Sequence, residues 1–139
     1  MKKDIESLLP VISEAINANN GKIRIFPKGK SMLPLIKEGI DSVVLEKADN
    51  IKKYDIVLFL GNDKKYSLHR ICKIKGDFFF LSGDNQSVFE KIRKEQIVAK
   101  VSDIYKGDIL LNTESKKYKN YIYKIVFFRP FRRIIRKLK

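Results

Sequence analysis

A serine, a histidine and an aspartate follow one another along the chain at positions that could support nucleophilic catalysis. The serine lies in a loop-like stretch that reads Gly29-Lys30-Ser31-Met32-Leu33-Pro34. A serine hydroxyl becomes a nucleophile when a base takes its proton and backbone N–H groups face the developing oxyanion. Gly29 lets a substrate approach the backbone closely, and Pro34 restricts the turn that follows. Alone, this short pattern also describes an ordinary turn.

His69, the only histidine, is the candidate for the base that activates Ser31. In a strand, His69 and the adjacent Arg70 would point to opposite faces of the sheet. A neutral imidazole can take the serine proton and return it to a leaving amine. A surface histidine on a strand edge is the alternative. Lys28 and Lys30 are weaker candidates for the base, because an exposed lysine stays protonated near neutral pH.

Asp84 is the candidate acid and lies in a polar turn that reads Ser82-Gly83-Asp84-Asn85-Gln86. An aspartate in such a turn usually caps backbone groups. It could instead orient His69 and stabilise the imidazolium that forms during catalysis. Each of the three signals is weak alone, and their order along the chain is the more informative observation.

A mainly β domain is predicted to position these residues. Short apolar or alternating runs, separated by Gly, Asn and Asp, predict a coiled or barrel-like sheet. The helical spacing of residues 4–18 predicts an N-terminal helix that starts near Leu9 or kinks at Pro10. We therefore divide the chain into an N-terminal helix (1–21), a β domain (22–108) and a basic amphipathic segment (109–139). The strand-like runs are 22–26, 42–45, 55–60, 66–74, 78–81 and 97–104.

The net charge of +14 is concentrated at the C-terminus, since no acidic residue follows Glu114. This basic segment predicts either contact with an anionic membrane or a helix packed on the core through Ile122, Ile125 and Val126. Nucleic acid ranks third as a partner. Pro130 predicts a kinked or two-piece helix. The predicted membrane contacts are Phe127, Phe128, Arg129, Phe131, Arg132, Arg133, Arg136 and Lys137.

Composition and chain length restrict the protein class. A chain of 139 residues fits one domain, and the lone Cys72 excludes an internal disulfide and a cysteine metal cluster. The sequence has no apolar run of the length of a signal peptide or a membrane span. We therefore expect a cytoplasmic protein without a cofactor, peripheral on the inner face of the membrane.

Five motifs in order resemble the successive boxes of the signal peptidase I family, which shares its β-fold with the self-cleaving LexA-type repressors. The resemblance covers about residues 22–105. The motifs are Gly29-Lys30-Ser31-Met32-Leu33-Pro34, Gly39-Ile40-Asp41-Ser42-Val43, Tyr54-Asp55-Ile56-Val57, Leu68-His69-Arg70-Ile71 and Ser82-Gly83-Asp84-Asn85.

The His-Arg box resembles the archaeal and endoplasmic-reticulum type rather than the lysine-dependent bacterial type. This resemblance implies that Ser31 is the nucleophile and His69 the general base, with either Asp84 or Glu90 as the acid. Many signal peptidases carry a serine at the position of Gly29, so the oxyanion donors here would be backbone N–H groups alone, at Gly29 and Ser31.

The chain also departs from the family pattern. Ile40 interrupts the first Gly-Asp pair, and Tyr54 replaces the glycine of the second. We also expect the protein to lack the usual transmembrane anchor and the DNA-reading domain that precedes the repressor peptidase.

The resemblance implies a serine endopeptidase, and we predict that it cleaves the leader or signal segment of a precursor peptide at a membrane surface. Small residues before the cut are what the family implies. The expected partners are the precursor peptide, an anionic membrane and a membrane protein. One alternative is a peptide- or membrane-binding module with weak turnover. The other is a LexA-like self-cleaving regulator, which ranks last because no Ala-Gly pair precedes Ser31.

Overall fold

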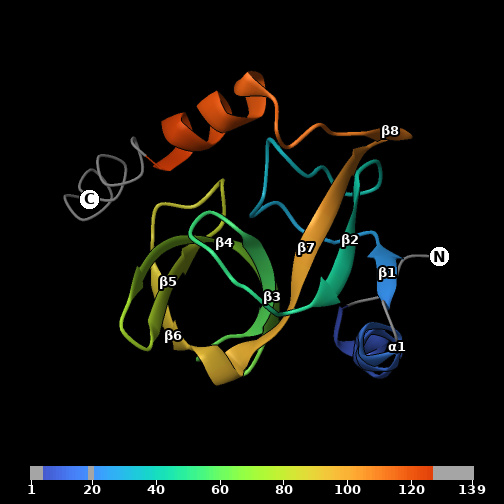
Figure 1. The fold of residues 1–139 in the computed structure, drawn as a ribbon, viewed down its shortest axis with the longest axis vertical. Coiled ribbons are helices and arrows are strands. Elements are labelled where there is room, and N and C mark those ends of the chain that lie inside the picture. Colours follow the sequence, from blue (N-terminus) through green and yellow to red (C-terminus); the bar gives the residue numbers. More distant parts are fainter. Residues whose placement is uncertain (1–4, 19–20, 127–139) are drawn as a thin grey trace.

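The fold is mainly β, as predicted, with one antiparallel eight-stranded sheet and a helix at each end. The computed structural model describes residues 5–18 and 21–126 (Figure 1). Along the sheet the strand order is β1-β2-β7-β3-β4-β5-β6, and β8 pairs with β7. The elements are α1 (Ile5–Asn17), β1 (Lys22–Ile25), β2 (Ser42–Lys47), β3 (Ile56–Leu60), β4 (Tyr66–Lys75), β5 (Phe78–Ser82), β6 (Glu90–Arg93), a 3-10 turn (Lys94–Gln96), β7 (Ile97–Lys106), β8 (Ile109–Leu110) and a helix over 116–126.

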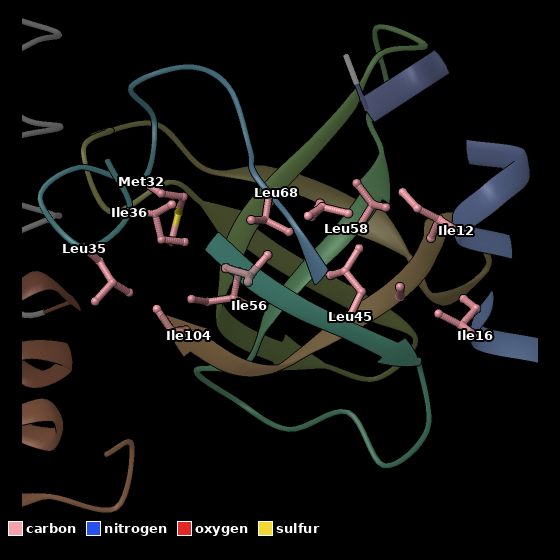
Figure 2. Packing of buried hydrophobic residues seen from close by; sticks show 13 residues of the cluster. Ile12, Ile16, Met32, Leu35, Ile36, Leu45, Ile56, Leu58, Leu68 and Ile104 are labelled. Carbon is pink, nitrogen blue, oxygen red and sulfur yellow. The ribbon is translucent and has the colours of Figure 1, made fainter. Parts of the chain in front are cut away.

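The sheet curls, so that β3, β4, β5 and β6 form a rounded wall while β7 crosses from β3 to β2 (Figure 1). This curvature creates two apolar clusters. The first contains Leu58 of β3 and Leu68 of β4 together with Ile12 of α1 (Figure 2). The second lies on the other face of the same strands and includes Phe59 and Ile71. Because both faces of β3 are buried, its sequence is a continuous apolar run rather than an alternating one.

Helix α1 runs without interruption through Pro10, so its start at Ile5 corrects the predicted start near Leu9. A proline inside a helix removes one backbone hydrogen bond. Ile12 and Ile16 of the following turns are buried in the first cluster. Packing of this apolar face against the sheet offsets the local loss, because tertiary contacts supply most of the stability of a short helix.

Strands β6 and β8 escaped the sequence prediction. In β6, only Ile92 is buried among three charged residues, so its pattern resembles a solvated loop. β8 has two exposed residues and forms because Tyr105 of β7 pairs with Leu110 across a turn at Gly107. Neither strand carries the apolar repeat on which a sequence prediction depends.

The two boxes that depart from the family pattern form turns. The carboxylate of Asp41 accepts hydrogen bonds from the amides of Lys37 at 2.8 Å and Gly107 at 3.0 Å, and from the Lys106 ammonium at 2.5 Å. In the second box, Tyr54 adopts a φ of 79°, a left-handed conformation that favours glycine. A glycine at this position would adopt the same conformation without strain.

Asp41 should stabilise the fold only where it is ionised. Burial alone would raise the pKa of Asp41, but its bonds to Lys106, Lys37 and Gly107 outweigh burial and hold the pKa below its usual range. A lowered pKa in the folded state gives stability that is present above the unfolded value, near 4, and lost as the pH falls through the folded value. We expect Asp41→Asn to lose about 2 kcal/mol at pH 7. Urea unfolding of both proteins checks this, and a difference that does not shrink towards pH 3 would contradict it.

The C-terminal helix starts directly after Ser115, whose hydroxyl accepts a hydrogen bond from the amide of Tyr118 at 3.1 Å, as in an N-cap. Ile122, Ile125 and Val126 are partly buried on it, and Tyr118 and Tyr121 of the same helix pack against the first apolar cluster. The predicted membrane contacts at 127–139 lie outside the described residues. Within 5–18 and 21–126, no helix is both long enough and apolar enough to cross a bilayer.

Candidate active site

The loop that carries Ser31 is held against the first apolar cluster by the residues that follow it. Met32, Leu35 and Ile36 are buried there, and Figure 2 shows their side chains gathered at one end of the cluster. The loop also closes on itself, since the amide of Ile36 donates to the carbonyl of Met32 at 3.0 Å. Ser31 itself stays partly exposed. A serine at the rim of a well-packed loop has the accessibility and the fixed position that a nucleophile requires.

The structure brings the Ser31 loop against the turn that contains Asp84. The amide of Asn85 donates to the carbonyl of Ser31 at 2.8 Å, and the Asn85 side chain donates to the carbonyl of Lys30 at 3.1 Å. The amide of Asp84 points at the sulfur of Met32, 3.4 Å away. Two segments about fifty residues apart in sequence therefore share one hydrogen-bonded surface.

Gly83 makes this contact possible because it has no side chain. A Cβ atom at this position would lie 2.3 Å from the carbonyl oxygen of Ser31 and 3.0 Å from its Cβ. The first distance is far inside van der Waals contact and involves backbone, which cannot rotate away. The glycine of this turn is thus required by the close approach of Ser31.

His69 lies in the middle of β4, on the face of the second apolar cluster. It is 8% exposed, and its ring centroid is 5.3 Å from that of Phe59. The adjacent Arg70 pairs with Ser82 across β4 and β5. If this antiparallel register continues by one residue, His69 stands opposite Gly83. The predicted alternation along β4 agrees with the structure, because Leu68 belongs to the first cluster.

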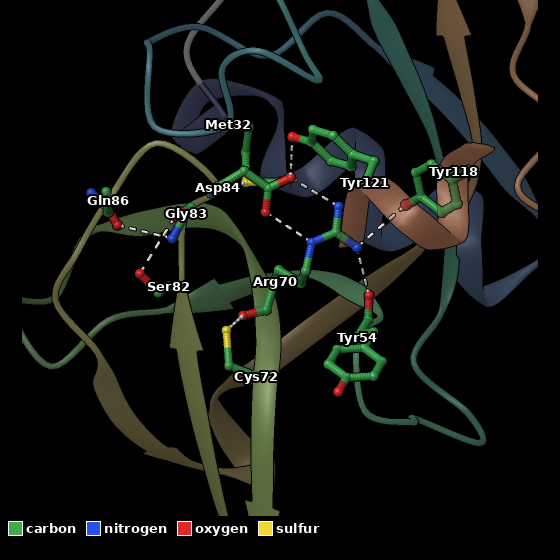
Figure 3. Close-up of polar contacts among 10 residues, drawn as sticks. All are labelled: Met32, Tyr54, Arg70, Cys72, Ser82, Gly83, Asp84, Gln86, Tyr118 and Tyr121. Carbon is green, nitrogen blue, oxygen red and sulfur yellow. Dashed lines mark hydrogen bonds and ion pairs between the residues drawn. The ribbon is translucent and has the colours of Figure 1, made fainter. Parts of the chain in front are cut away.

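Asp84 forms a buried ion pair with Arg70 (Figure 3). The guanidinium donates from Nε to Oδ1 at 2.8 Å and from Nη2 to Oδ2 at 2.9 Å, and neither side chain is exposed to solvent. Oδ2 also accepts a hydrogen bond from the hydroxyl of Tyr121 at 2.8 Å. Within the described chain, the carboxylate of Asp84 therefore binds Arg70 and Tyr121 rather than His69.

The remaining donor of Arg70 reaches two further segments. Its Nη1 donates to the carbonyl of Tyr54 at 2.9 Å and to the hydroxyl of Tyr118 at 3.3 Å. Burial alone would lower the pKa of Arg70. The hydrogen bonds to Asp84 and the attraction to its negative charge have a larger, opposite effect, so the pKa is raised overall. The pKa of Tyr121 is raised by burial and by the negative charge of Asp84. Arg70 and Tyr121 thus keep their protons across the neutral range.

Glu90, the second candidate acid, lies at the start of β6. Its Oε2 accepts a hydrogen bond from the amide of Asn62 at 2.6 Å, which fixes the turn between β3 and β4. Both candidate acids therefore have structural partners. The identity of an acid that orients His69 stays a prediction.

The two predicted oxyanion donors differ in their partners. The amide of Gly29 donates to the carboxylate of Glu38 at 2.5 Å, and Gly29 has a φ of 100°. The amide of Ser31 has no hydrogen-bond acceptor among residues 5–18 and 21–126. A backbone N–H without an acceptor beside the nucleophile can serve an oxyanion. Ser31 is therefore the better-placed donor of the two.

A small cavity of about 90 Å³ opens beside Ser31. Apolar side chains of Ile5, Met32, Ile36 and Leu68 line much of it. A larger hollow of about 560 Å³ lies between the turn at residues 52–56, β7 and the C-terminal helix. Ser31, His69 and Gly83 do not line the larger one. The smaller cavity includes Ser31, but His69 and Gly83 do not line it.

Sequence reasoning missed the part that Tyr118 and Tyr121 play in this site. Their spacing of three residues on a predicted helix places them on one face, and this was the available signal. No three His, Cys, Asp or Glu side chains of the described chain converge as a metal site requires. Comparisons of the chain with protein-family models, with curated proteins and with solved structures found no match.

Proposed function

We propose that the protein is a serine endopeptidase of the signal-peptidase type, in which Ser31 is the nucleophile and His69 the general base. The fold proposed with it is the coiled β-sheet of the signal peptidases and LexA-type repressors. The eight-stranded antiparallel sheet and the order of the five motifs support this reading. The acid partner is either Asp84, acting through its turn, or Glu90.

The observation that carries the proposal is the close approach of Ser31 to Gly83. Facing residues on paired strands have Cβ atoms about 5 Å apart on the same side of the sheet. If Gly83 stands opposite His69, the space left by its missing side chain is shared by Ser31 and the imidazole. The Ser31 Cβ lies 3.0 Å from the point where a Gly83 Cβ would be. We propose that Ser31 and His69 meet in this space for proton transfer.

The reaction follows from this arrangement. As the Ser31 oxygen attacks the scissile carbonyl carbon, His69 takes its proton, and the carbonyl oxygen gains the negative charge. The amide of Ser31 donates to that oxygen. His69 then gives its proton to the leaving amine as the C–N bond breaks. A water molecule, deprotonated by His69, hydrolyses the acyl-enzyme and restores Ser31.

The cavity beside Ser31 supports a substrate with a small apolar side chain next to the cut. Its volume is about 90 Å³, and Met32, Ile36 and Leu68 contribute apolar side chains to its lining. An extended peptide segment can add to a sheet edge and place alternate side chains in pockets. The basic C-terminal sequence supports an anionic membrane surface as the place of action. We place the protein in the cytoplasm and propose the leader peptide of a precursor as its substrate.

Peptide cleavage tests the proposal directly. The wild type is incubated with a panel of synthetic leader peptides whose candidate cut sites follow Ala, Gly, Ser or Leu, and the products are identified by mass spectrometry. We expect internal cleavage after the small residues, and no cleavage by Ser31→Ala. Ser13→Ala, the same change on the exposed face of α1, should cleave as the wild type does.

Cleavage by Ser31→Ala at the wild-type rate would show that another group is the nucleophile. If the wild type binds a peptide of the panel without cutting it, this result would favour the binding-module alternative over the peptidase. A fragment of the enzyme itself in the mass spectrum would instead favour the self-cleaving regulator.

A further inference from the structure

The C-terminal helix contacts the candidate site through two tyrosines rather than through its charged face. Figure 3 shows Tyr118 and Tyr121 side by side above the Arg70–Asp84 pair, with their ring centroids 6.3 Å apart. Both rings also pack against the first apolar cluster. This end of the helix is therefore anchored by packing and by hydrogen bonds together.

The two hydroxyl groups have different roles in these bonds. The Tyr121 hydroxyl donates to Oδ2 of Asp84 at 2.8 Å, whereas the Tyr118 hydroxyl accepts from Arg70 at a longer 3.3 Å. Both bonds involve a charged side chain and are therefore stronger than bonds between neutral groups, but the bond to Asp84 is the shorter one. Tyr121 thus makes the stronger of the two contacts.

Asp84 passes this restraint to the loop of the nucleophile. Its own amide points at the sulfur of Met32, and the amide of the next residue, Asn85, donates to the carbonyl of Ser31. A shift of the Asp84 side chain would move the peptide units on either side of it. These peptide units are the ones that hold Ser31 and Met32.

We infer that Tyr121 is a positioning residue for Ser31, acting through Asp84 and the turn at residues 83–85. This inference rests on the proposed peptidase function for its catalytic meaning, and on the hydrogen bonds alone for its structural meaning. The helix over 116–126 is then a working part of the site rather than only the carrier of a basic segment. Removal of the hydroxyl leaves the ring packing but frees the turn to move.

The test compares Tyr121→Phe with Tyr123→Phe in the full chain. Tyr123 lies on the same helix and is 69% exposed, so the control removes the same hydroxyl from an exposed position. The first readout is amide hydrogen exchange at Asn85, measured by NMR without any substrate. We expect Tyr121→Phe to raise this exchange about tenfold, the size of effect of one lost hydrogen bond to a charged group. The amides of β3 and β7 should keep their wild-type exchange.

The second readout is kinetic and uses the peptide that the wild type cuts fastest. We expect Tyr121→Phe to lower kcat several-fold with KM nearly unchanged, because the substrate contacts remain while the nucleophile is less well placed. Tyr123→Phe should match the wild type in both readouts.

Unchanged exchange at Asn85 in Tyr121→Phe would overturn the inference. A uniform rise across all strands would also overturn it, since that reports lost global stability rather than local positioning. If the wild type cuts no peptide, the proposed function fails, while the exchange at Asn85 still decides whether Tyr121 holds the Ser31 loop.

Discussion

Replacing His69 with alanine should reduce peptide cleavage by about 10²–10⁴-fold, the range that general acid–base catalysis contributes. Without the imidazole, the Ser31 hydroxyl keeps its proton and the leaving amine receives none. The measured quantity is kcat/KM for the best leader peptide. His69 is buried beside Phe59, so its replacement could also destabilise the fold. The loss of cleavage reports a catalytic role only if the variant unfolds at nearly the same urea concentration as the wild type.

The double variant Ser31→Ala/His69→Ala sharpens this prediction. Residues that act as one catalytic unit show strongly non-additive effects. The kcat/KM of the double variant should therefore equal that of the slower single variant. Added imidazole should restore part of the activity of His69→Ala, because the substitution leaves a cavity beside Phe59, but none of Ser31→Ala. Losses that multiply in the double variant would contradict a shared proton-transfer step.

Replacing Arg70 with alanine should destabilise the fold by about 3–5 kcal/mol, the cost of leaving a buried charge without its partner. The variant leaves the buried side chain of Asp84 without its ion-pair partner and removes a donor from the Tyr54 carbonyl. Because a domain of this size has a free energy of unfolding of about 5–15 kcal/mol, the variant should lose a large share of its stability. Urea unfolding followed by circular dichroism measures the difference.

A double variant separates the cost of an unpaired charge from the value of the pair. Arg70→Met/Asp84→Leu removes both charges and keeps much of the side-chain volume, so we expect it to be more stable than Arg70→Ala. The same double variant should lower peptide cleavage, since the turn at 83–85 loses its anchor. A double variant less stable than Arg70→Ala would show that packing, rather than charge burial, decides the effect.

The main part of the fold was predictable because it depends on local patterns. The apolar run at 56–60 and the longer run from Tyr66 have the length and β-branched content of buried strands, and both are strands in the structure. Glycine-containing turns separated them correctly. β6 was not predictable, because its place in the sheet depends on pairing with β5 and not on its own pattern.

The candidate site was predictable in its members but not in their partners. The order of Ser31, His69 and Asp84 marked the three segments, and the structure brings the Ser31 loop and the Asp84 turn together. From the sequence, Asp84 could either cap backbone groups of its turn or orient His69, and no local pattern pairs it with Arg70. That choice depends on which face of β4 each side chain occupies. Contacts with Tyr121, far along the chain, are set by tertiary packing that no local pattern contains.

The late position of β7 in the sequence affects when a growing chain can complete its sheet. β2 pairs with β7, with Ser42 opposite Tyr105 and Lys47 opposite Ala99. One edge of β2 therefore stays unpaired until β7 has been synthesised. Asn85, which contacts Ser31, is synthesised before β7, whereas Tyr121, which binds Asp84, is synthesised after it. Non-local pairing of this kind also makes folding slow. If Ser31 is the nucleophile that we propose, a ribosome-bound chain should cleave no peptide until β7 has completed the sheet.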